Sequence, residues 1–201
     1  MTTSSPRTLD YGRLPPLPIR KFSVDEYHRL GEVGVLTTDD RVELLEGWIL
    51  QKMTHNPPHG ASVDHLRDVL ADLLPDGWRV RAQLPVTTAD SEPEPDLVVV
   101  RGPASRYVSR HPSAEDAALI VEIADTSLER DREVKGPIYS RAGFPVYWIV
   151  NLVERRVEVY SDPSPTGGYH SRRDGSIGDH VSLRVGDEEP REIAVKMVFV
   201  A

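Results

Sequence analysis

The sequence predicts an α/β fold with a central mixed β-sheet flanked by helices, and three observations support this prediction. Residues 118–124 read ALIVEIA, a mostly apolar run rich in β-branched residues, which favours a strand buried on both faces. Residues 61–74 carry apolar side chains at the three- and four-residue spacing of an amphipathic helix. Helical and strand patterns also alternate along the chain, an order typical of helices packed on a sheet.

The length and composition are those of an ordinary globular protein. The chain has 201 residues, of which 39% are hydrophobic, enough for one domain with a full core. The run Leu14-Pro15-Pro16-Leu17-Pro18 favours extended chain, so we expect a flexible N-terminal arm over residues 1–20. Residues 21–201 are then expected to form a single domain.

Charge and cysteine content limit the class of protein. The absence of cysteine excludes disulfides and thiolate zinc sites and fits a reducing cytoplasm. No run approaches the roughly 20 apolar residues of a membrane-spanning helix, and no secretory signal follows Met1. The net charge of -8 argues against a tight nonspecific nucleic-acid binder. It does not argue against a nucleic-acid enzyme, because a carboxylate-rich metal site contributes to that charge.

The first half of the predicted domain begins with a helix and a hairpin. Ser23 and Glu26 match a capping box, which predicts a short helix running to about Leu30. Glu46-Gly47 separates two strand patterns and predicts a hairpin turn. Strands are expected at residues 41–45, 48–53, 79–84, 97–100 and 119–124, with the long helix at 61–74.

The second half continues with a helix and more strands. A helix is expected from Ser127 to about Ala142, with Pro137 as a source of a kink. Residues 146–152 and 156–160 predict another strand pair. Alternation is weaker from Tyr169 onward, and the last expected strand covers residues 193–200.

Glu122 is the one charged residue in the run 118–124. A buried carboxylate is costly unless it is hydrogen-bonded, paired, protonated or bound to a metal. Asp96 stands at the start of the preceding core strand, after prolines that keep the chain extended. If the two strands are neighbours, the carboxylates of Asp96 and Glu122 converge and require a divalent cation or a shared proton. Oxygen ligands of this kind suit Mg²⁺ or Mn²⁺.

Lys135 supplies a cation for the same region. It lies on the helix that follows the Glu122 strand, and helical spacing relates it to Leu128, Arg132 and Tyr139, so one face could turn it over the strand end. Two acids, a metal and a lysine suit phosphodiester hydrolysis, because the metal lowers the pKa of water and the lysine stabilises the charged transition state.

Simpler interpretations compete with these roles. Asp96 alone would be a strand-entry acid that bonds to loop amides. Glu122 would form a buried ion pair with Arg101 or Arg132. Lys135 would form an exposed pair with Asp131, four residues earlier, worth roughly 0.3 kcal/mol.

The ordered motifs resemble a known superfamily. Pro95-Asp96, then Glu122, then a lysine is similar to the PD-(D/E)xK nuclease superfamily, which includes many restriction endonucleases. The similarity is greatest to its large branch of bacterial restriction-endonuclease-like proteins of unknown function. The motifs cover about residues 22–160: Val42 to Leu50, Pro57-Pro58-His59, Pro95-Asp96, Val121 to Ser127, Asp131, Lys135, Tyr139, Ala142-Gly143 and Tyr147-Trp148.

The resemblance implies a restriction-endonuclease-like core and magnesium-dependent cleavage of DNA. It implies Asp96, Glu122 and Lys135 as catalytic residues, with Asp96, Glu122 and the carbonyl of Ile123 as metal ligands. In the superfamily pattern the lysine comes two residues after the acid, where this chain has Ala124. The branch moves the lysine onto the following helix. Restriction endonucleases often act as homodimers, so the resemblance also fits a homodimer.

Three more residues are candidates for the same site. Glu43 is a further carboxylate by resemblance, although a surface acid on a hairpin fits it equally. His59 could contact a phosphate, and Gln83 could point toward the same cleft. His55 and His59 have a metal-ligand spacing, but the prolines between them argue against a helix that aligns them. No residue is assigned to DNA binding. Candidates for phosphate contacts, or for an ordinary solvated face, are Arg101, Arg106, Arg110, Arg172 and Arg173.

Two other functions remain open at this point. A chain with Ala124 in the lysine position could be an inactive nuclease fold that binds DNA or a protein. The acidic net charge favours, more weakly, a metal-dependent hydrolase of a small phosphorylated substrate.

Overall fold

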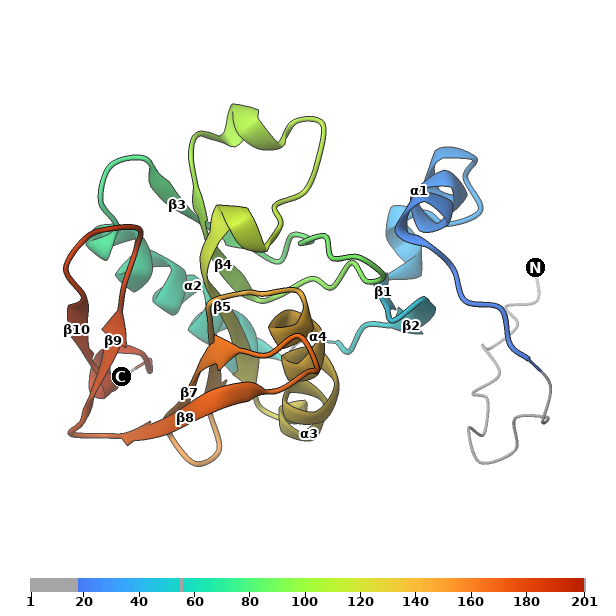
Figure 1. Ribbon diagram of the computed structural model, residues 1–201. Coiled ribbons are helices and arrows are strands. Elements are labelled where there is room, and N and C mark those ends of the chain that lie inside the picture. The colour runs from blue at the N-terminus through green and yellow to red at the C-terminus, as the bar shows by residue number, and fades with distance from the viewer. Residues whose placement is uncertain (1–17, 55, 201) are drawn as a thin grey trace.

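The computed structural model describes residues 18–54 and 56–200, and its centre is a six-stranded β-sheet (Figure 1). The strands follow the spatial order β3-β4-β5-β6-β7-β8. Their bounds are β3 Trp78–Ala82, β4 Leu97–Arg101, β5 Ala117–Ala124, β6 Val146–Asn151, β7 Arg156–Pro163 and β8 Tyr169–Ser176.

The sheet is mixed, as the sequence predicted. Strands β5 and β6 are parallel, with Glu122 opposite Ile149, and every other neighbouring pair is antiparallel. A parallel pair needs a long crossover, and the helical segment between β5 and β6 supplies it. Glu122 therefore lies on an inner strand, next to β4 on one side and β6 on the other.

Helices cover both faces of the sheet. On one face, α2 (Pro57–Leu73) contributes Val63, Leu66 and Leu70 to a core shared with odd-numbered residues of β5 such as Val121. On the other face, Tyr139 from α4 (Gly136–Arg141) packs with even-numbered residues such as Ile120. Because side chains alternate along a strand, Glu122 points toward the α4 face.

The crossover between β5 and β6 is helical from Leu128 to Arg141, but it is not one regular α-helix. It consists of α3 (Leu128–Arg130), a π-helical turn η5 (Asp131–Lys135) and α4. The N–H of Gly136 donates to the carbonyl of Asp131, five residues earlier. Pro137 follows at the start of α4, and it has no N–H to continue an α-helical pattern. The predicted helix is thus present, and the irregularity falls beside the proline.

The N-terminal lobe, residues 18–54, lies beside the sheet-containing body (Figure 1). It contains α1 (Val24–Glu32), η2 (Thr38–Asp40), β1 (Val42–Leu45) and β2 (Trp48–Gln51). The predicted capping box of Ser23 and Glu26 is formed, and β1 and β2 form the predicted antiparallel hairpin. Both turn residues of the hairpin have positive φ, 50° at Glu46 and 80° at Gly47.

An extended segment, residues 83–96, connects the lobe to the body. It leaves β3, reaches β1 and returns to β4. The N–H of Glu92 donates to the carbonyl of Leu44 at 2.7 Å, and the N–H of Gly47 donates to the carbonyl of Asp90 at 2.9 Å. The hairpin is therefore held by backbone hydrogen bonds to a segment that ends at Asp96.

Most predicted boundaries differ from the observed ones by three residues or fewer, and two differ by more. Helix α2 begins at Pro57 rather than Ala61, because Pro57 and Pro58 occupy its first positions and the side chain of Asn56 caps it. The two prolines therefore begin a helix, whereas we expected them to prevent one at this point. The expected strand at 193–200 ends early, since β10 (Arg191–Ala194) is followed by a 3₁₀ turn, η6 (Val195–Met197). Strand β10 pairs with β9 (His180–Leu183).

Most of the predicted arm, residues 1–17, and His55 lie outside the described residues. Residues 18–20 are exposed and have no regular secondary structure. Among the described residues, no helix has the length and apolar character needed to cross a membrane.

Candidate functional site

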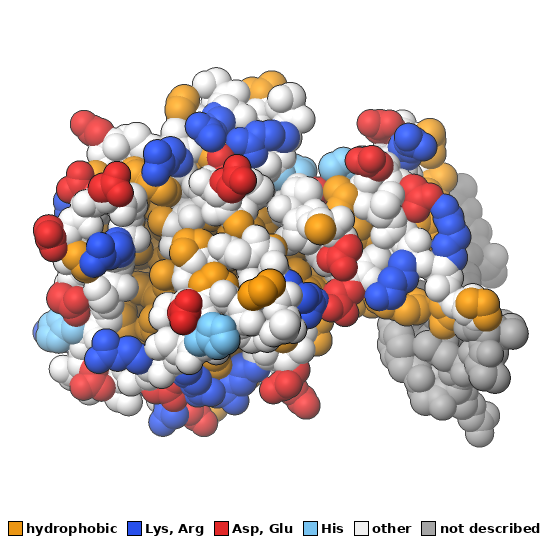
Figure 2. All heavy atoms as spheres, in the orientation of Figure 1, with side chains coloured by type: hydrophobic (Ala, Val, Ile, Leu, Met, Phe, Trp, Pro, Cys, Tyr) orange, Lys and Arg blue, Asp and Glu red, His pale blue; other side chains and the backbone are white. Residues whose placement is uncertain are grey.

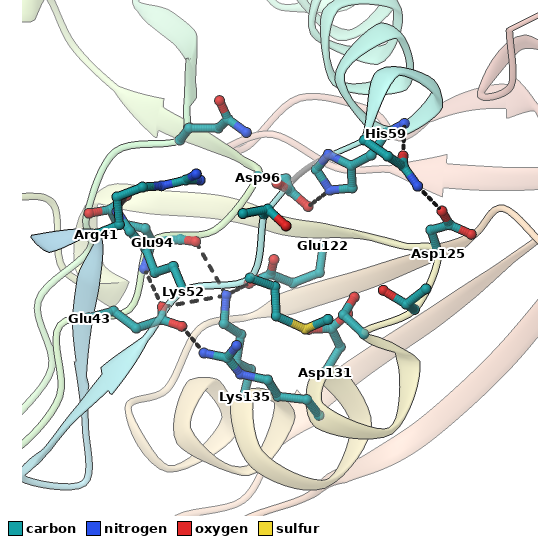
Figure 3. Close-up of a pocket in the computed structure, with 17 residues that line it drawn as sticks. Arg41, Glu43, Lys52, His59, Glu94, Asp96, Glu122, Asp125, Asp131 and Lys135 are labelled. Carbon is teal, nitrogen blue, oxygen red and sulfur yellow. Dashed lines mark hydrogen bonds and ion pairs between the residues drawn. The ribbon is translucent and has the colours of Figure 1, made fainter. Parts of the chain in front are cut away.

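A cavity of about 280 Å³ opens where the hairpin of the lobe meets the ends of β4 and β5. It receives residues from β1, from the chain that follows β2, from the start of α2, from the segment 83–96, from β5 and from the crossover (Figure 3). All six side chains that the sequence assigned to the site line it: Glu43, His59, Gln83, Asp96, Glu122 and Lys135. The fold therefore brings together residues that are far apart in the sequence.

Asp96 and Glu122 lie opposite each other on neighbouring strands. The antiparallel register pairs Leu97 with Val121, and its continuation by one residue places Asp96 across from Glu122. Opposite residues of an antiparallel pair project from the same face, with Cβ atoms roughly 4.5–5.5 Å apart. Both side chains are buried. The sheet thus creates the carboxylate pair that the sequence suggested.

The Asp96 carboxylate is held by two hydrogen bonds to Oδ2. The N–H of Ile123 donates at 2.8 Å, and Nε2 of His59 lies 3.0 Å away. Burial alone would raise the pKa of Asp96, but the contacts with His59 and Ile123 outweigh it and hold the pKa below its ordinary value. Asp96 is therefore ionised at neutral pH.

The Glu122 carboxylate is bound on Oε1 from the helical crossover. Nζ of Lys135 donates at 2.9 Å and the hydroxyl of Tyr139 donates at 2.7 Å. Burial raises the pKa of Glu122 to about 8; Lys135 opposes this shift, whereas Asp131 and Asp96 add to it. The site therefore has an excess of buried carboxylate, which a further cation would stabilise.

Lys135 reaches the site despite its distance from Glu122 in the sequence. Its Nζ also donates to the carbonyl of Glu94 at 3.3 Å and lies 3.6 Å from Oε2 of Glu43. Burial would lower the pKa of Lys135, but Glu122 and Glu43 outweigh it and keep the pKa above its ordinary value. Lys135 is therefore a buried ammonium.

The competing ion pairs considered for Lys135 and Glu122 are not formed among the described residues. The Asp131 carboxylate accepts from the Ser127 hydroxyl at 2.6 Å rather than pairing with Lys135. Arg132 pairs with Glu158, and Arg101 lies over the ring of Trp78, so neither neutralises Glu122.

Glu43 connects the lobe to the site. One of its carboxylate oxygens pairs with Arg130 of α3, and the other accepts from the N–H of Glu94 at 3.1 Å. Glu43 is buried on β1, so it is not the surface acid that was considered as an alternative.

Gln83 directly follows β3 and has a positive φ of 51°. Its N–H donates to the carbonyl of Asp96 at 3.0 Å, so the chain bends at the wall of the cavity.

The residues fit a hard divalent cation. Among the residues that the structure describes, neither Oδ1 of Asp96 nor Oε2 of Glu122 receives a hydrogen bond. The N–H and C=O of one residue in an antiparallel pair face the same neighbour, so the carbonyl of Ile123 faces the Asp96 side, as its N–H does. Two carboxylate oxygens and one carbonyl oxygen form a donor set for Mg²⁺ or Mn²⁺.

Several contacts in and beside the cavity were not predicted. Tyr139 does not line the cavity and was not assigned to the site, yet its hydroxyl donates to Glu122; its position four residues after Lys135 was the available signal. Lys52 pairs with Glu94 at 2.6 Å and Asn56 donates to Asp125 at 2.5 Å. These pairs join distant segments, and no local pattern indicates them.

The arginines named as candidates for phosphate contacts lie elsewhere. Arg106 and Arg110 both bind the buried carboxylate of Asp116, and Arg172 binds Asp174 at 2.8 Å. None of the five lines the cavity. The basic side chains that do line it are Arg41, Lys52, Arg130 and Lys135.

Comparison with known proteins places the chain in a family. The model of the Uma2 family, described as "Putative restriction endonuclease", matches residues 24–186. The chain belongs to the Uma2 family. The match includes the lobe hairpin, the carboxylate pair and the crossover, and it confirms the predicted relation to restriction-endonuclease-like proteins.

A solved structure shows the same fold as this Uma2 chain. It is described as a "putative nuclease belonging to DUF820" from Anabaena variabilis ATCC 29413, and it superposes with a TM-score of 0.67. The two chains are 20% identical, and the alignment covers 90% of this chain and 98% of the other. No curated protein matches the chain.

Proposed function

We propose that this Uma2 protein is a metal-dependent endodeoxyribonuclease that hydrolyses DNA phosphodiester bonds. In this proposal Asp96, Glu122 and the Ile123 carbonyl hold Mg²⁺ or Mn²⁺, and Asp96, Glu122 and Lys135 are catalytic. The convergence of two buried carboxylates and a buried ammonium on one cavity carries the proposal. The family's description supports the nuclease class.

The metal would lower the pKa of water and offset charge on the phosphate. The chain's own residues would contact the phosphate or the water and orient the two carboxylates. Lys135 is held by Glu122 and the Glu94 carbonyl, so its ammonium is fixed beside the carboxylates, where it would contact a phosphate oxygen or orient water. His59 and the Ile123 N–H orient Asp96, and Tyr139 orients Glu122.

Basic side chains in the wall of the cavity favour a substrate that contains phosphate. Arg41, Lys52 and Arg130 line the cavity from the lobe and α3. Phosphate contacts of this kind position a nucleic-acid backbone without reading its sequence. A homodimer acting on both strands and a cytoplasmic location belong to the same proposal.

Cleavage of a supercoiled plasmid tests the function. The wild-type protein with Mg²⁺ or Mn²⁺ is expected to nick or linearise the plasmid, and a chelator is expected to stop it. Asp96→Asn removes the charge but keeps the shape, and we expect it to lose cleavage with an unchanged circular dichroism spectrum. Asp72→Asn, on the exposed side of α2, is the matched control and should cut like wild type. Wild-type cleavage rates in Asp96→Asn would disprove the assignment.

A second candidate is a nuclease fold that binds DNA or a protein without cutting. The observation in its favour is that Lys135 and Tyr139 already occupy Oε1 of Glu122. This alternative predicts DNA binding that does not change when metal is removed, measured by gel shift with and without chelator. Metal-dependent cleavage that Lys135→Ala abolishes would exclude it.

A further inference from the structure

Three side chains of the types that bind metal ions lie close together outside the candidate site, between the lobe and the body. His28 comes from α1, Glu92 from the segment 83–96 and His111 from the loop between β4 and β5. One ligand atom from each lies within 4.8 Å of the others, and no other group of three meets this condition in residues 18–54 and 56–200. Figure 2 shows histidine side chains in the notch between the lobe and the body.

Glu92 is a buried carboxylate with unusual partners. Nε2 of His28 lies 2.8 Å from both of its oxygens, the Thr87 hydroxyl donates at 2.8 Å, and Nε2 of His111 lies 3.9 Å from Oε1. Among the described residues, no lysine or arginine forms an ion pair with Glu92. A buried carboxylate whose ionic partners are only imidazoles is costly unless a cation joins it.

The two imidazoles are placed to act as ligands. Their ring centroids are 6.2 Å apart and the rings are inclined by 66°, so they approach Glu92 from different directions. An imidazole ring binds a metal ion through a ring nitrogen that carries no proton.

The group is also open to solvent. The side chains of His28 and His111 are 43% and 34% exposed, and both line a cavity of about 850 Å³. An ion could enter from this cavity, and water could complete its coordination shell. The separations of 2.8 and 3.9 Å bracket the spacing of about 3.3 Å between ligand atoms in a tetrahedral zinc site with bonds near 2.05 Å.

We propose that His28, Glu92 and His111 bind a divalent transition-metal ion of the zinc class. Two imidazole nitrogens and one carboxylate oxygen suit Zn²⁺, whereas Mg²⁺ and Ca²⁺ prefer oxygen ligands alone. The site is separate from the carboxylate pair of the candidate active site and does not depend on its function.

The ion would fasten the N-terminal lobe to the body. Its ligands come from α1, from the connecting segment and from the loop next to β5. The lobe carries Glu43 and Lys52, which line the candidate active site, so a metal at this joint would fix one wall of that site. Binding only to the folded arrangement stabilises it by mass action.

Zinc titration by calorimetry tests the proposal on the full chain after treatment with a chelator. We expect wild type to bind one Zn²⁺ here in addition to any ion at the candidate active site, and His28→Asn and His111→Asn to weaken this binding at least about tenfold. His170→Asn, an exposed histidine on β8, is the matched control and should bind like wild type. Glu122→Gln should keep the Zn²⁺ binding that the histidine variants lose, because it alters only the candidate active site.

A second measurement separates a metal ligand from a merely structural histidine. Zn²⁺ should slow amide hydrogen exchange in α1 and in the loop that carries His111, in wild type but not in His111→Asn. Circular dichroism without metal should show that both histidine variants fold, and each variant tests the site independently. The proposal is overturned if wild type does not bind Zn²⁺, if binding survives both histidine variants, or if Glu122→Gln abolishes it.

Discussion

Lys135 donates a 2.9 Å hydrogen bond to Oε1 of Glu122, and both side chains are buried. Tyr139, one helical turn after Lys135, donates to the same oxygen at 2.7 Å. The strand and the helix that follows it are thereby joined through one carboxylate. The sequence position two residues after Glu122 holds Ala124, so the lysine reaches the acid from the crossover instead.

Removing the lysine should destabilise the protein strongly. Lys135→Met leaves Glu122 and Glu43 buried beside a side chain without charge, and breaking a buried pair from one side typically costs about 3–5 kcal/mol. We expect a loss of about 3 kcal/mol in the free energy of unfolding, measured with urea. The exposed Lys196→Met is the control and should stay within about 0.5 kcal/mol of wild type.

Neutralising the acid in the same background should recover part of that loss. Glu122→Gln removes the carboxyl that Lys135→Met leaves without its ammonium partner, so the double variant should be more stable than the sum of the two single changes predicts. If the two effects simply add, the ion pair does not hold the crossover on β5.

The hairpin turn of the lobe should not tolerate a side chain at Gly47. Its φ is +80°, and an added Cβ would lie 2.6 Å from Cβ of Lys21 and 3.0 Å from the carbonyl oxygen of Phe22. We expect Gly47→Ala to cost about 3 kcal/mol, from backbone strain plus a steric clash. Gly143 has a similar φ of +84° and nothing within 4 Å, so Gly143→Ala should cost only about 1 kcal/mol. Equal losses in urea unfolding would contradict the clash.

Patterns with a strong period predicted their elements well. The run 118–124 became an inner strand, and the apolar spacing in 61–74 became α2. The expected strand at 193–200 failed because the buried residues Val195, Val198 and Phe199 follow a spacing of three or four rather than two. That spacing matches the 3₁₀ turn observed at Val195–Met197.

The site was predictable where it depends on neighbouring strands. Asp96 and Glu122 meet because consecutive core strands pair, which is the common arrangement. The pairing of Glu43 with Arg130 was not predictable, because it depends on how the lobe packs against the crossover. The same reason applies to Arg106 and Arg110, which bind Asp116 and were named instead as candidates for phosphate contacts.

Asp116 should make stability depend on acid pH. The hydrogen bond from Arg110 lowers the pKa of Asp116; burial opposes the shift, but the Ser113 N–H and Arg106 strengthen it. A carboxyl with a lower pKa in the folded state contributes stability above its ordinary value of 3.8, and the contribution is lost as pH falls through the folded pKa. Both arginines are nearly half exposed, so we expect Asp116→Asn to cost only about 2 kcal/mol at neutral pH.

Urea unfolding across a pH series measures this dependence. The difference between wild type and Asp116→Asn should stay constant from neutral pH down to about pH 5 and shrink below about pH 4. The exposed Asp72→Asn should differ little from wild type at any pH. A difference that is unchanged below pH 4 would show that the charge of Asp116 is not what the arginines stabilise.

His59 should act by positioning Asp96. Its Nε2 lies 3.0 Å from Oδ2 of Asp96 and helps to hold the pKa of that carboxyl below its ordinary value against the opposing effect of burial. His59→Ala removes this contact, so the pKa of Asp96 should rise and its carboxylate should lose one of the two hydrogen bonds that orient it.

We expect Mn²⁺ affinity, measured by calorimetry with a short DNA duplex present, to fall about 10–100-fold in His59→Ala. Mn²⁺ binding should also disappear at a higher pH than in wild type, because Asp96 is protonated earlier as pH falls. His65→Ala, on the same helix but bonded to the carbonyl of Met197, should change neither quantity. A lower affinity with an unshifted pH profile would mean that His59 only supports the fold of α2, and an unchanged affinity would mean that Asp96 does not need it.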